Sequence, residues 1–256
     1  MTASPLKVWR ERDGRLLRLR LDRPKANLVD NAMVTAIDAA LAEGEGDRHL
    51  LCVLIDHAGP HFSYGASIQE HMPETCAGML TLFHGLIGRM VAYPLPILVA
   101  LRGHCLGGGL ELASAGTLLF ATPDADIGQP EIKLAVYAPA ASCLLPERIA
   151  YGAVMDLLLS GRSITGEEAK QIGLVIETAA DPEKAALAYF ETYYAGLSAS
   201  SLRFARQAAD AGRAQRIKAR LAEVEKLYLD GLMKTHDPVE GLKAFLEKRP
   251  PRWKDR

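Results

Sequence analysis

The chain has 256 residues, of which 49% are hydrophobic and 24% charged, and its 30 basic and 31 acidic side chains give a formal net charge of −1. This composition predicts a globular protein with a sizeable core. The balanced charge argues against nucleic acid or an anionic membrane surface as a partner.

The N-terminus, the longest apolar run and the cysteines indicate where in the cell the protein is expected. The N-terminus is charged and lacks the apolar stretch of a secretory signal, and the longest strongly apolar run near the middle, "LPILVAL", is too short to span a bilayer. The four cysteines lie far apart and form no C-x-x-C pair, which is typical of buried thiols in a reducing compartment. We therefore expect a cytoplasmic protein.

The first three quarters of the chain alternate strand-like and helix-like segments. A hairpin is expected around Asp13-Gly14, because apolar alternating runs flank this turn dipeptide. The alternation of strand-like and helix-like segments predicts an α/β fold with largely parallel strand pairing. The expected helices cover residues 31–41 and 76–93, and the expected strands cover 51–56, 96–101, 117–122 and 174–178.

From about residue 198 the sequence pattern indicates almost only helices. We therefore divide the chain into an α/β core, 1–197, and a helical C-terminal region, 198–256. The last helix has clear boundary signals. Asp237 is expected to cap it, Pro238 occupies its first turn, and prolines follow its end.

Three consecutive glycines, Gly107 to Gly109, stand between an apolar strand and a helix-like run in "RGHCLGGGLELASAG". Neither phosphate-loop motif fits. A Walker loop would need Gly-Lys-Ser/Thr where Leu110-Glu111 follows, and a dinucleotide fingerprint would need glycine in place of Leu112. Two interpretations remain: a tight strand–helix crossing that needs small residues, or free helix-start amides that stabilise an acyl oxyanion.

A second loop of small residues, Gly65-Ala66, follows the strand expected at 51–56. Loops at the carboxyl ends of neighbouring parallel strands can meet, and open α/β sheets usually bind ligands there. One amide from each loop would form an oxyanion hole with two donors.

With these residues, the sequence resembles the crotonase, or enoyl-CoA hydratase/isomerase, superfamily. The resemblance runs essentially end to end, through "LDRPKAN", "FSYGASI", "GHCLGGGLELA", "IGQPEIKL", "LLLSGRSITGEEAKQIGLV" and "EGLKAFLEKR". It implies a crotonase-like ββα spiral core, a helical trimerisation region and a homotrimer or a dimer of trimers.

The resemblance also implies roles for individual residues, while requiring no metal and no cofactor beyond the coenzyme A that the substrate carries. The amides of Ala66 and Gly108 match the oxyanion hole for an acyl-CoA thioester, and Glu111 and Glu131 match the two hydratase glutamates. The positions implied to contact coenzyme A are Lys25, Ala26, Ser67, Ile68, Phe245 and Lys248, the last two reaching a neighbouring subunit's ligand.

Two carboxyl groups suit hydration, which needs a base to take a proton from water and an acid to deliver one to carbon. Either glutamate alone could be an ordinary surface or helix-start charge. Glu111 stands two residues after the glycines, and Glu131 lies in "DADIGQPEIKL", where we expect an extended loop. Which glutamate is protonated stays open, since coupled groups titrate together.

Several stretches, among them "GPHFSYGAS" and "AVYAPAASCLLPERI", are similar to those of the superfamily's hydratases that act on a conjugated cyclic dienoyl-CoA in anaerobic benzoyl-CoA degradation. Ala138, Pro139, Ala140 and Ser142 replace the usual glycine-rich turn, which predicts a reshaped acyl pocket; Tyr137 either lines this pocket or packs in the core. The alternatives are a general short-chain enoyl-CoA hydratase and a non-catalytic RNA-binding relative. His57 and His61 have the i,i+4 spacing of a helical metal pair, but the loop expected between them contains Pro60, which argues against a metal site.

Overall fold

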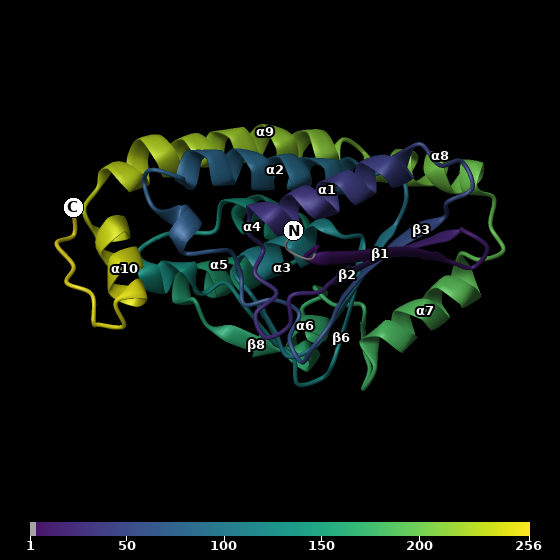
Figure 1. Cartoon of the computed structure of the whole chain (residues 1–256), viewed down its shortest axis with the longest axis horizontal. Coiled ribbons are helices and arrows are strands. Elements are labelled where there is room, and N and C mark those ends of the chain that lie inside the picture. The colour runs from purple at the N-terminus through teal and green to yellow at the C-terminus, as the bar shows by residue number, and fades with distance from the viewer. Residues whose placement is uncertain (1–3) are drawn as a thin grey trace.

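The computed structural model describes residues 4–256, which form two sheets wrapped by helices (Figure 1). The larger sheet has six strands in the order β1-β2-β3-β4-β6-β9, and the smaller has the order β5-β7-β8. The strands are β1 (Leu6–Glu11), β2 (Leu16–Leu21), β3 (Cys52–His57), β4 (Ile97–Leu101), β5 (His104–Leu106), β6 (Leu118–Ala121), β7 (Asp126–Gly128), β8 (Ser163–Thr165) and β9 (Glu177–Thr178).

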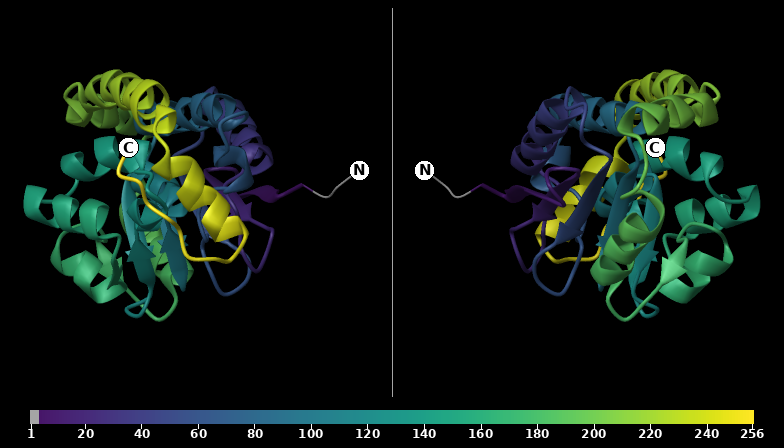
Figure 2. Two further views of the ribbon diagram at one scale, coloured as in Figure 1. Left: turned by 90° about the vertical axis from the view of Figure 1, so that its left-hand side faces the viewer. Right: turned by 90° about the vertical axis from the view of Figure 1, so that its right-hand side faces the viewer.

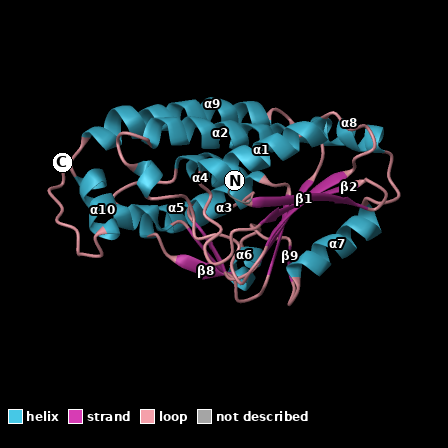
Figure 3. Ribbon diagram, in the orientation of Figure 1, coloured by secondary structure: helices cyan, strands magenta, loops and turns pink. Residues whose placement is uncertain are grey.

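Ten α-helices cover these sheets in the described part of the chain. Figure 3 shows α1, α2 and α9 as a layer along one side of the strands and α7 on the other side. The helices are α1 (Asn31–Glu45), α2 (Cys76–Ala92), α3 (Gly108–Ala115), α4 (Pro139–Leu144), α5 (Tyr151–Ser160), α6 (Gly166–Gln171), α7 (Pro182–Tyr193), α8 (Ala199–Asp210), α9 (Arg213–Lys226) and α10 (Asp237–Leu246). Shorter turns are η1 (Gln69–His71), η2 (Pro130–Leu134), η3 (Leu145–Glu147), the π-helical η4 (Leu227–Gly231) and η5 (Leu232–Lys234).

The expected α/β architecture is confirmed. β1 and β2 form the antiparallel hairpin, while β2, β3, β4, β6 and β9 pair in parallel. After β4 the chain passes through β5 of the small sheet into α3, which is one strand–strand–helix unit of the expected spiral. β3 and β4 are buried along their whole length because helices cover both faces of the sheet.

One expected strand is much shorter than its apolar run. The segment 174–178 contributes only Glu177–Thr178 to the sheet as β9. The amides of Leu174 and Val175 instead donate to the carbonyl of Ala169, so these residues close the turn after α6. Their side chains are buried, which explains the apolar pattern without a strand.

The C-terminal helices α8 and α9 lie above the strands in both side views of Figure 2, whereas α10 lies at one end of the molecule (Figure 1). α9 packs against α2 and α4 and buries Ile217, Leu221 and Val224 in the main core. The division between 197 and 198 falls in the connection between α7 and α8; as a domain boundary it stays a prediction. No helix among residues 4–256 is long and apolar enough to cross a bilayer.

The prediction that Asp237 caps the last helix is wrong. His236 holds the N-cap position of α10, and Asp237 is the first helical residue. The Asp237 carboxylate accepts hydrogen bonds from the amides of Lys254 and Asp255, both at 2.8 Å. Asp237 therefore ties the C-terminal tail to α10 instead of closing the start of this helix.

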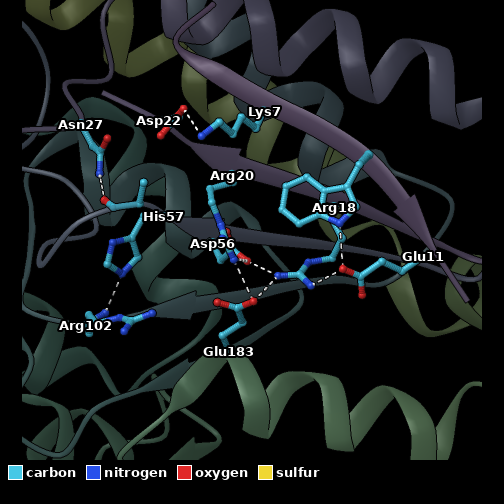
Figure 4. A network of polar contacts seen from close by, with 12 residues as sticks. Lys7, Glu11, Arg18, Arg20, Asp22, Asn27, Asp56, His57, Arg102 and Glu183 are labelled. Carbon is cyan, nitrogen blue, oxygen red and sulfur yellow. Dashed lines mark hydrogen bonds and ion pairs between the residues drawn. The ribbon is translucent and has the colours of Figure 1, made fainter. Parts of the chain in front are cut away.

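A buried ionic network joins the hairpin, β3 and α7 (Figure 4). Arg18, whose side chain is 2% exposed, pairs with Asp56 on β3, with Glu183 on α7 at 2.6 Å and with Glu11 at 2.9 Å. Arg20 also binds Asp56, with 2.5 Å between Nε and Oδ1. One carboxylate that is 1% exposed thus compensates two guanidinium groups.

Replacing Asp56 should therefore destabilise the protein strongly. We expect Asp56→Asn to lower the free energy of unfolding by about 3–5 kcal/mol, because it removes the most deeply buried carboxylate that binds both Arg18 and Arg20. Denaturant unfolding measures this loss. Asp38→Asn, which removes the half-exposed partner of Arg89, is the matched control and should cost at most about 1 kcal/mol. Equal losses in both variants would contradict the importance of the buried network.

Candidate active site

The glycine loop is shaped by protein groups that approach its backbone closely. Gly107 has φ +51°, a left-handed conformation that favours glycine, and a Cβ there would lie 2.5 Å from Oε1 of Glu131. A Cβ on Gly108 would lie 3.0 Å from the amide nitrogen of Ala66, and one on Gly109 would lie 2.7 Å from Cβ of Ser63. Gly107 and Gly109 leave no room for a Cβ atom and Gly108 is tightly packed, as one of the two interpretations of the triplet expected.

The two small-residue loops meet as the sequence predicts. Gly65 has φ +107° and lies against the carbonyl of Leu106 and the amide of Gly108. The carbonyl of Ser63 accepts from the amide of Leu106 at 3.0 Å, which joins the loop after β3 to β5. Among residues 4–256 neither the Ala66 nor the Gly108 amide has a hydrogen-bond partner in the protein. Both amides are therefore available to an acceptor from outside.

A cavity of about 80 Å³ lies at this junction and contains both predicted glutamates. Two wider grooves, one along α2 and α9 and one beside α8, contain neither glutamate. The cavity is lined by residues from the two loops, from η1, α2, η2 and α10, and from the start of α4: Tyr64, Gly65, Ala66, Ile68, His71, Met79, Leu80, Phe83, Gly107, Gly108, Glu111, Pro130, Glu131, Leu134, Val136, Tyr137, Ala138, Pro139 and Leu242.

Glu111 is held at the bottom of this site. It lies in the first turn of α3, its side chain is almost fully buried, and its Oε1 accepts a hydrogen bond from the amide of Ala141 at 2.9 Å. Burial raises the pKa of Glu111, although hydrogen bonds from the Ala141 and Ala140 amides act in the opposite direction. Glu111 can therefore hold a proton near neutral pH.

Glu131 lies in the 3₁₀ turn η2, whereas the sequence suggested an extended loop. Pro130 begins this turn, and Ala135 ends it in a left-handed conformation with φ +56°. Burial raises the pKa of Glu131, and repulsion from Glu111 raises it further. The two carboxyls thus share a site in which full ionisation of both is unfavourable.

Gln129 is a site residue that the sequence analysis missed. It is 1% exposed, and with its NH2 group turned toward Glu131 it donates to Oε2 at 2.9 Å and to Oε1 at 3.1 Å. These bonds fix the position of the carboxylate. The sequence feature that could have identified Gln129 is its position two residues before Glu131, between Gly128 and Pro130.

The structure brings only some of the predicted coenzyme A residues to the cavity. Ile68 lines it, whereas Ser67 bonds through its hydroxyl to Gln69 at 3.2 Å. Ala26 is beside the site, since its carbonyl accepts from the Tyr64 amide at 2.9 Å. Lys25 precedes it with φ +97°. Phe245, which is 56% exposed, and Lys248 lie at the end of α10, outside the cavity.

His57 and His61, which were considered as a metal pair, both accept hydrogen bonds from backbone amides. His57 ends β3 and accepts at Nε2 from the amide of Arg102 at 3.2 Å, while His61 accepts at Nδ1 from the amide of His104 at 3.1 Å. Within residues 4–256 no group of three His, Cys, Asp or Glu side chains is placed to hold a metal ion. The four cysteines are free and buried, as expected.

A sequence profile described as "Enoyl-CoA hydratase/isomerase" matches residues 11–256. The chain belongs to the enoyl-CoA hydratase/isomerase family. It is 61% identical over 254 residues to the "Cyclohexa-1,5-dienecarbonyl-CoA hydratase" of Thauera aromatica, which covers 99% of this chain and 98% of that protein. It is 31% identical over 251 residues to the "2,3-dehydroadipyl-CoA hydratase" of Escherichia coli strain K12, covering 96% of this chain and 97% of that one.

Solved structures agree on the fold of this family member. The crystal structure of an enoyl-CoA hydratase from Mycobacterium avium subsp. paratuberculosis K-10 superposes with a TM-score of 0.86 at 22% identity, covering 99% of this chain and all of the other. An enoyl-CoA hydratase from Geobacillus kaustophilus HTA426 superposes with a TM-score of 0.76 at 27% identity, covering 100% and 98% of the two chains. The crotonase-like fold expected from the sequence is confirmed.

The raised pKa of Glu131 predicts a pH-dependent effect on stability. Because the folded state holds this proton more tightly than the unfolded chain does, the stability that it provides is complete below the unfolded pKa, about 4.3, and is lost as pH rises through the folded pKa. Glu131→Gln removes the carboxyl that titrates and therefore does not lose this stability as pH rises. We therefore expect its free energy of unfolding, relative to the parent, to increase between pH 5 and pH 8.5.

Denaturant unfolding at both pH values measures this difference. Glu43→Gln, at an exposed position of α1, is the control and should show no comparable trend. A Glu131→Gln difference that stays constant with pH would mean that the carboxyl titrates in its ordinary range.

Proposed function

We propose that this protein adds water to a conjugated cyclic dienoyl-CoA, converting cyclohexa-1,5-diene-1-carbonyl-CoA into 6-hydroxycyclohex-1-ene-1-carbonyl-CoA. The observation that carries this proposal is the 61% identity, over almost the whole of both chains, to a hydratase whose name specifies that substrate. The cavity supports it, because a buried and a partly buried carboxyl lie beside two amides that have no hydrogen-bond partner among residues 4–256. The reaction belongs to the anaerobic degradation of aromatic acids through benzoyl-CoA.

In this proposal the thioester oxygen lies between the amides of Ala66 and Gly108. Attack of water on the ring moves negative charge onto this oxygen, and two fixed donors stabilise the charge without rearranging. Losing one such donor typically reduces the rate by about 10²–10³-fold. The helix-start position of Gly108 contributes further, because the N-terminus of α3 carries partial positive charge.

Proton and electron movements balance without a redox partner. Water attacks C2, the β-carbon, and its electron pair forms the new C–O bond, while the C1=C2 pair becomes a dienolate extending through C6=C5. One glutamate takes a proton from the water. The other glutamate delivers a proton to C5, the C1=C6 double bond forms, and the hydroxyl group remains on the carbon next to C1.

The pair of carboxyls suits these two transfers because one can be ionised while the other is protonated. Their mutual repulsion favours one shared proton over two charges. Burial and repulsion from Glu111 together raise the pKa of Glu131, which favours Glu111 as the group that is ionised first. Gln129 donates to both oxygens of Glu131 and so holds this carboxyl in place.

The remaining contacts with the substrate belong to the same proposal. Lys25 and Ala26, with Ser67 and Ile68, would contact the coenzyme A moiety that leaves the cavity, while Phe245 and Lys248 would reach the ligand of a neighbouring subunit. A homotrimer or a dimer of trimers would bring α10 to that neighbour. No separate cofactor is required, because the chemistry uses only the thioester and side chains. The four buried thiols favour a cytoplasmic location.

Incubation with two thioesters tests the substrate. We expect a gain of one water mass with cyclohexa-1,5-diene-1-carbonyl-CoA, at a higher kcat/KM than with crotonyl-CoA. Mass spectrometry follows both reactions. A water gain confined to crotonyl-CoA would indicate a general short-chain enoyl-CoA hydratase. Absence of turnover with both thioesters, together with salt-dependent RNA binding, would indicate the non-catalytic alternative.

Replacing either glutamate tests the acid–base pair. Glu111→Gln and Glu131→Gln should each reduce kcat by about 10²–10⁴-fold, the range for loss of a general acid or base, while thioester binding stays within a few-fold. Steady-state kinetics and calorimetric binding measure the two quantities. The exposed Glu43→Gln should match the parent. Full turnover in both site variants would exclude these glutamates from the chemistry.

A further inference from the structure

His71 contributes a ring to the cavity that holds the two glutamates, and the mechanism above does not use it. It is the last residue of η1, the short turn that follows Ala66 and Ile68. Its side chain lines the cavity together with Glu111 and Glu131.

The hydrogen bonding of His71 fixes its tautomer. Nδ1 lies 2.8 Å from the backbone carbonyl oxygen of Ser67. A carbonyl oxygen only accepts hydrogen bonds, so Nδ1 must carry the proton. Burial lowers the pKa of the ring, which keeps it neutral near pH 7. Nε2 is therefore unprotonated and can act only as an acceptor.

No group among residues 4–256 donates to this acceptor. Of the two ring nitrogens of His71, only Nδ1 makes a hydrogen bond within the described part of the chain. The wall of the cavity is otherwise largely apolar, with Met79, Leu80 and Phe83 contributed by α2. The hydroxyl of Tyr137 is already engaged, since it donates to the carbonyl of Val224 at 2.7 Å. Nε2 is therefore free to accept from a donor that a ligand or water brings into the cavity.

We propose that Nε2 of His71 accepts a hydrogen bond from the hydroxyl group that the added water becomes on the acyl ring. This inference rests on the proposed hydration. The acyl part of the diene has no O–H or N–H donor, whereas the attacking water and the hydroxylated product both have one. His71 is thus a positioning residue that selects hydroxylated over unsubstituted acyl groups.

A neutral imidazole complements the glutamates in this role. Each glutamate gains or loses a proton as water adds to the ring, so its capacity to accept a hydrogen bond changes during the reaction. The Ser67 carbonyl holds the His71 tautomer constant through the same steps. The oxygen of the nucleophile therefore keeps one acceptor while both carboxyls exchange protons.

Binding of two matched thioesters to variants of the full chain tests this role. The probes are 6-hydroxycyclohex-1-ene-1-carbonyl-CoA and cyclohex-1-ene-1-carbonyl-CoA, which differ only in the hydroxyl group. We expect His71→Leu to weaken binding of the hydroxylated probe by up to about tenfold and to leave the other unchanged. His71→Gln, which retains an acceptor, should restore most of the difference. His49→Leu, at an exposed position before β3, is the control and should bind both probes like the parent.

Two results would overturn the proposal. Equal weakening of both probes would show that His71 only packs, and unchanged binding of both would show that no hydrogen bond forms. If the parent binds neither ring, the proposed cyclic substrate is wrong. The pair 3-hydroxybutyryl-CoA and butyryl-CoA then applies the same comparison to His71, so the two failures are separable.

Discussion

The site depends on how closely two backbone segments approach one another at the glycine triplet. Gly107 and Gly109 lie against Glu131 and Ser63 at distances that leave no room for a Cβ atom, and Gly108 packs tightly against Ala66. The same contacts that make glycine necessary place two free amides and one carboxyl together. Backbone packing and the proposed oxyanion hole are thus one arrangement, and the two interpretations of the triplet do not exclude each other.

Around this junction the protein keeps its ionisable groups in two contrasting environments. Asp56, although buried, is matched by two guanidinium groups and joins the hairpin and β3, with Glu183 of α7 bound to the same arginines. In the described part of the chain, Glu111 and Glu131 have no cationic partner and receive only amide donors. The first carboxylate supports the fold, whereas the second pair retains the affinity for protons that acid–base chemistry needs.

Much of this could be predicted from the sequence, because the decisive signals are local. The Asp13-Gly14 turn predicts the hairpin, and Gly65-Ala66 and the triplet predict two loops at neighbouring strand ends. What escaped prediction depends on contacts between distant segments. The brevity of β9 follows from backbone bonds to Ala169, and the role of Asp237 follows from amides at Lys254 and Asp255. Gln129 and His71 looked like ordinary polar residues until the fold placed them at the cavity.

The segment that begins at Tyr137 performs two tasks that cannot be altered independently. Tyr137, Ala138 and Pro139 shape the acyl wall, and immediately afterwards the amide of Ala141 holds the carboxylate of Glu111. A substitution or insertion that widens this wall for a new acyl group also shifts the donor that orients the carboxyl of Glu111. If Glu111 acts as proposed, divergence in substrate range within such a scaffold is therefore constrained: accommodating a different molecule requires simultaneous readjustment of the proposed proton-transfer groups.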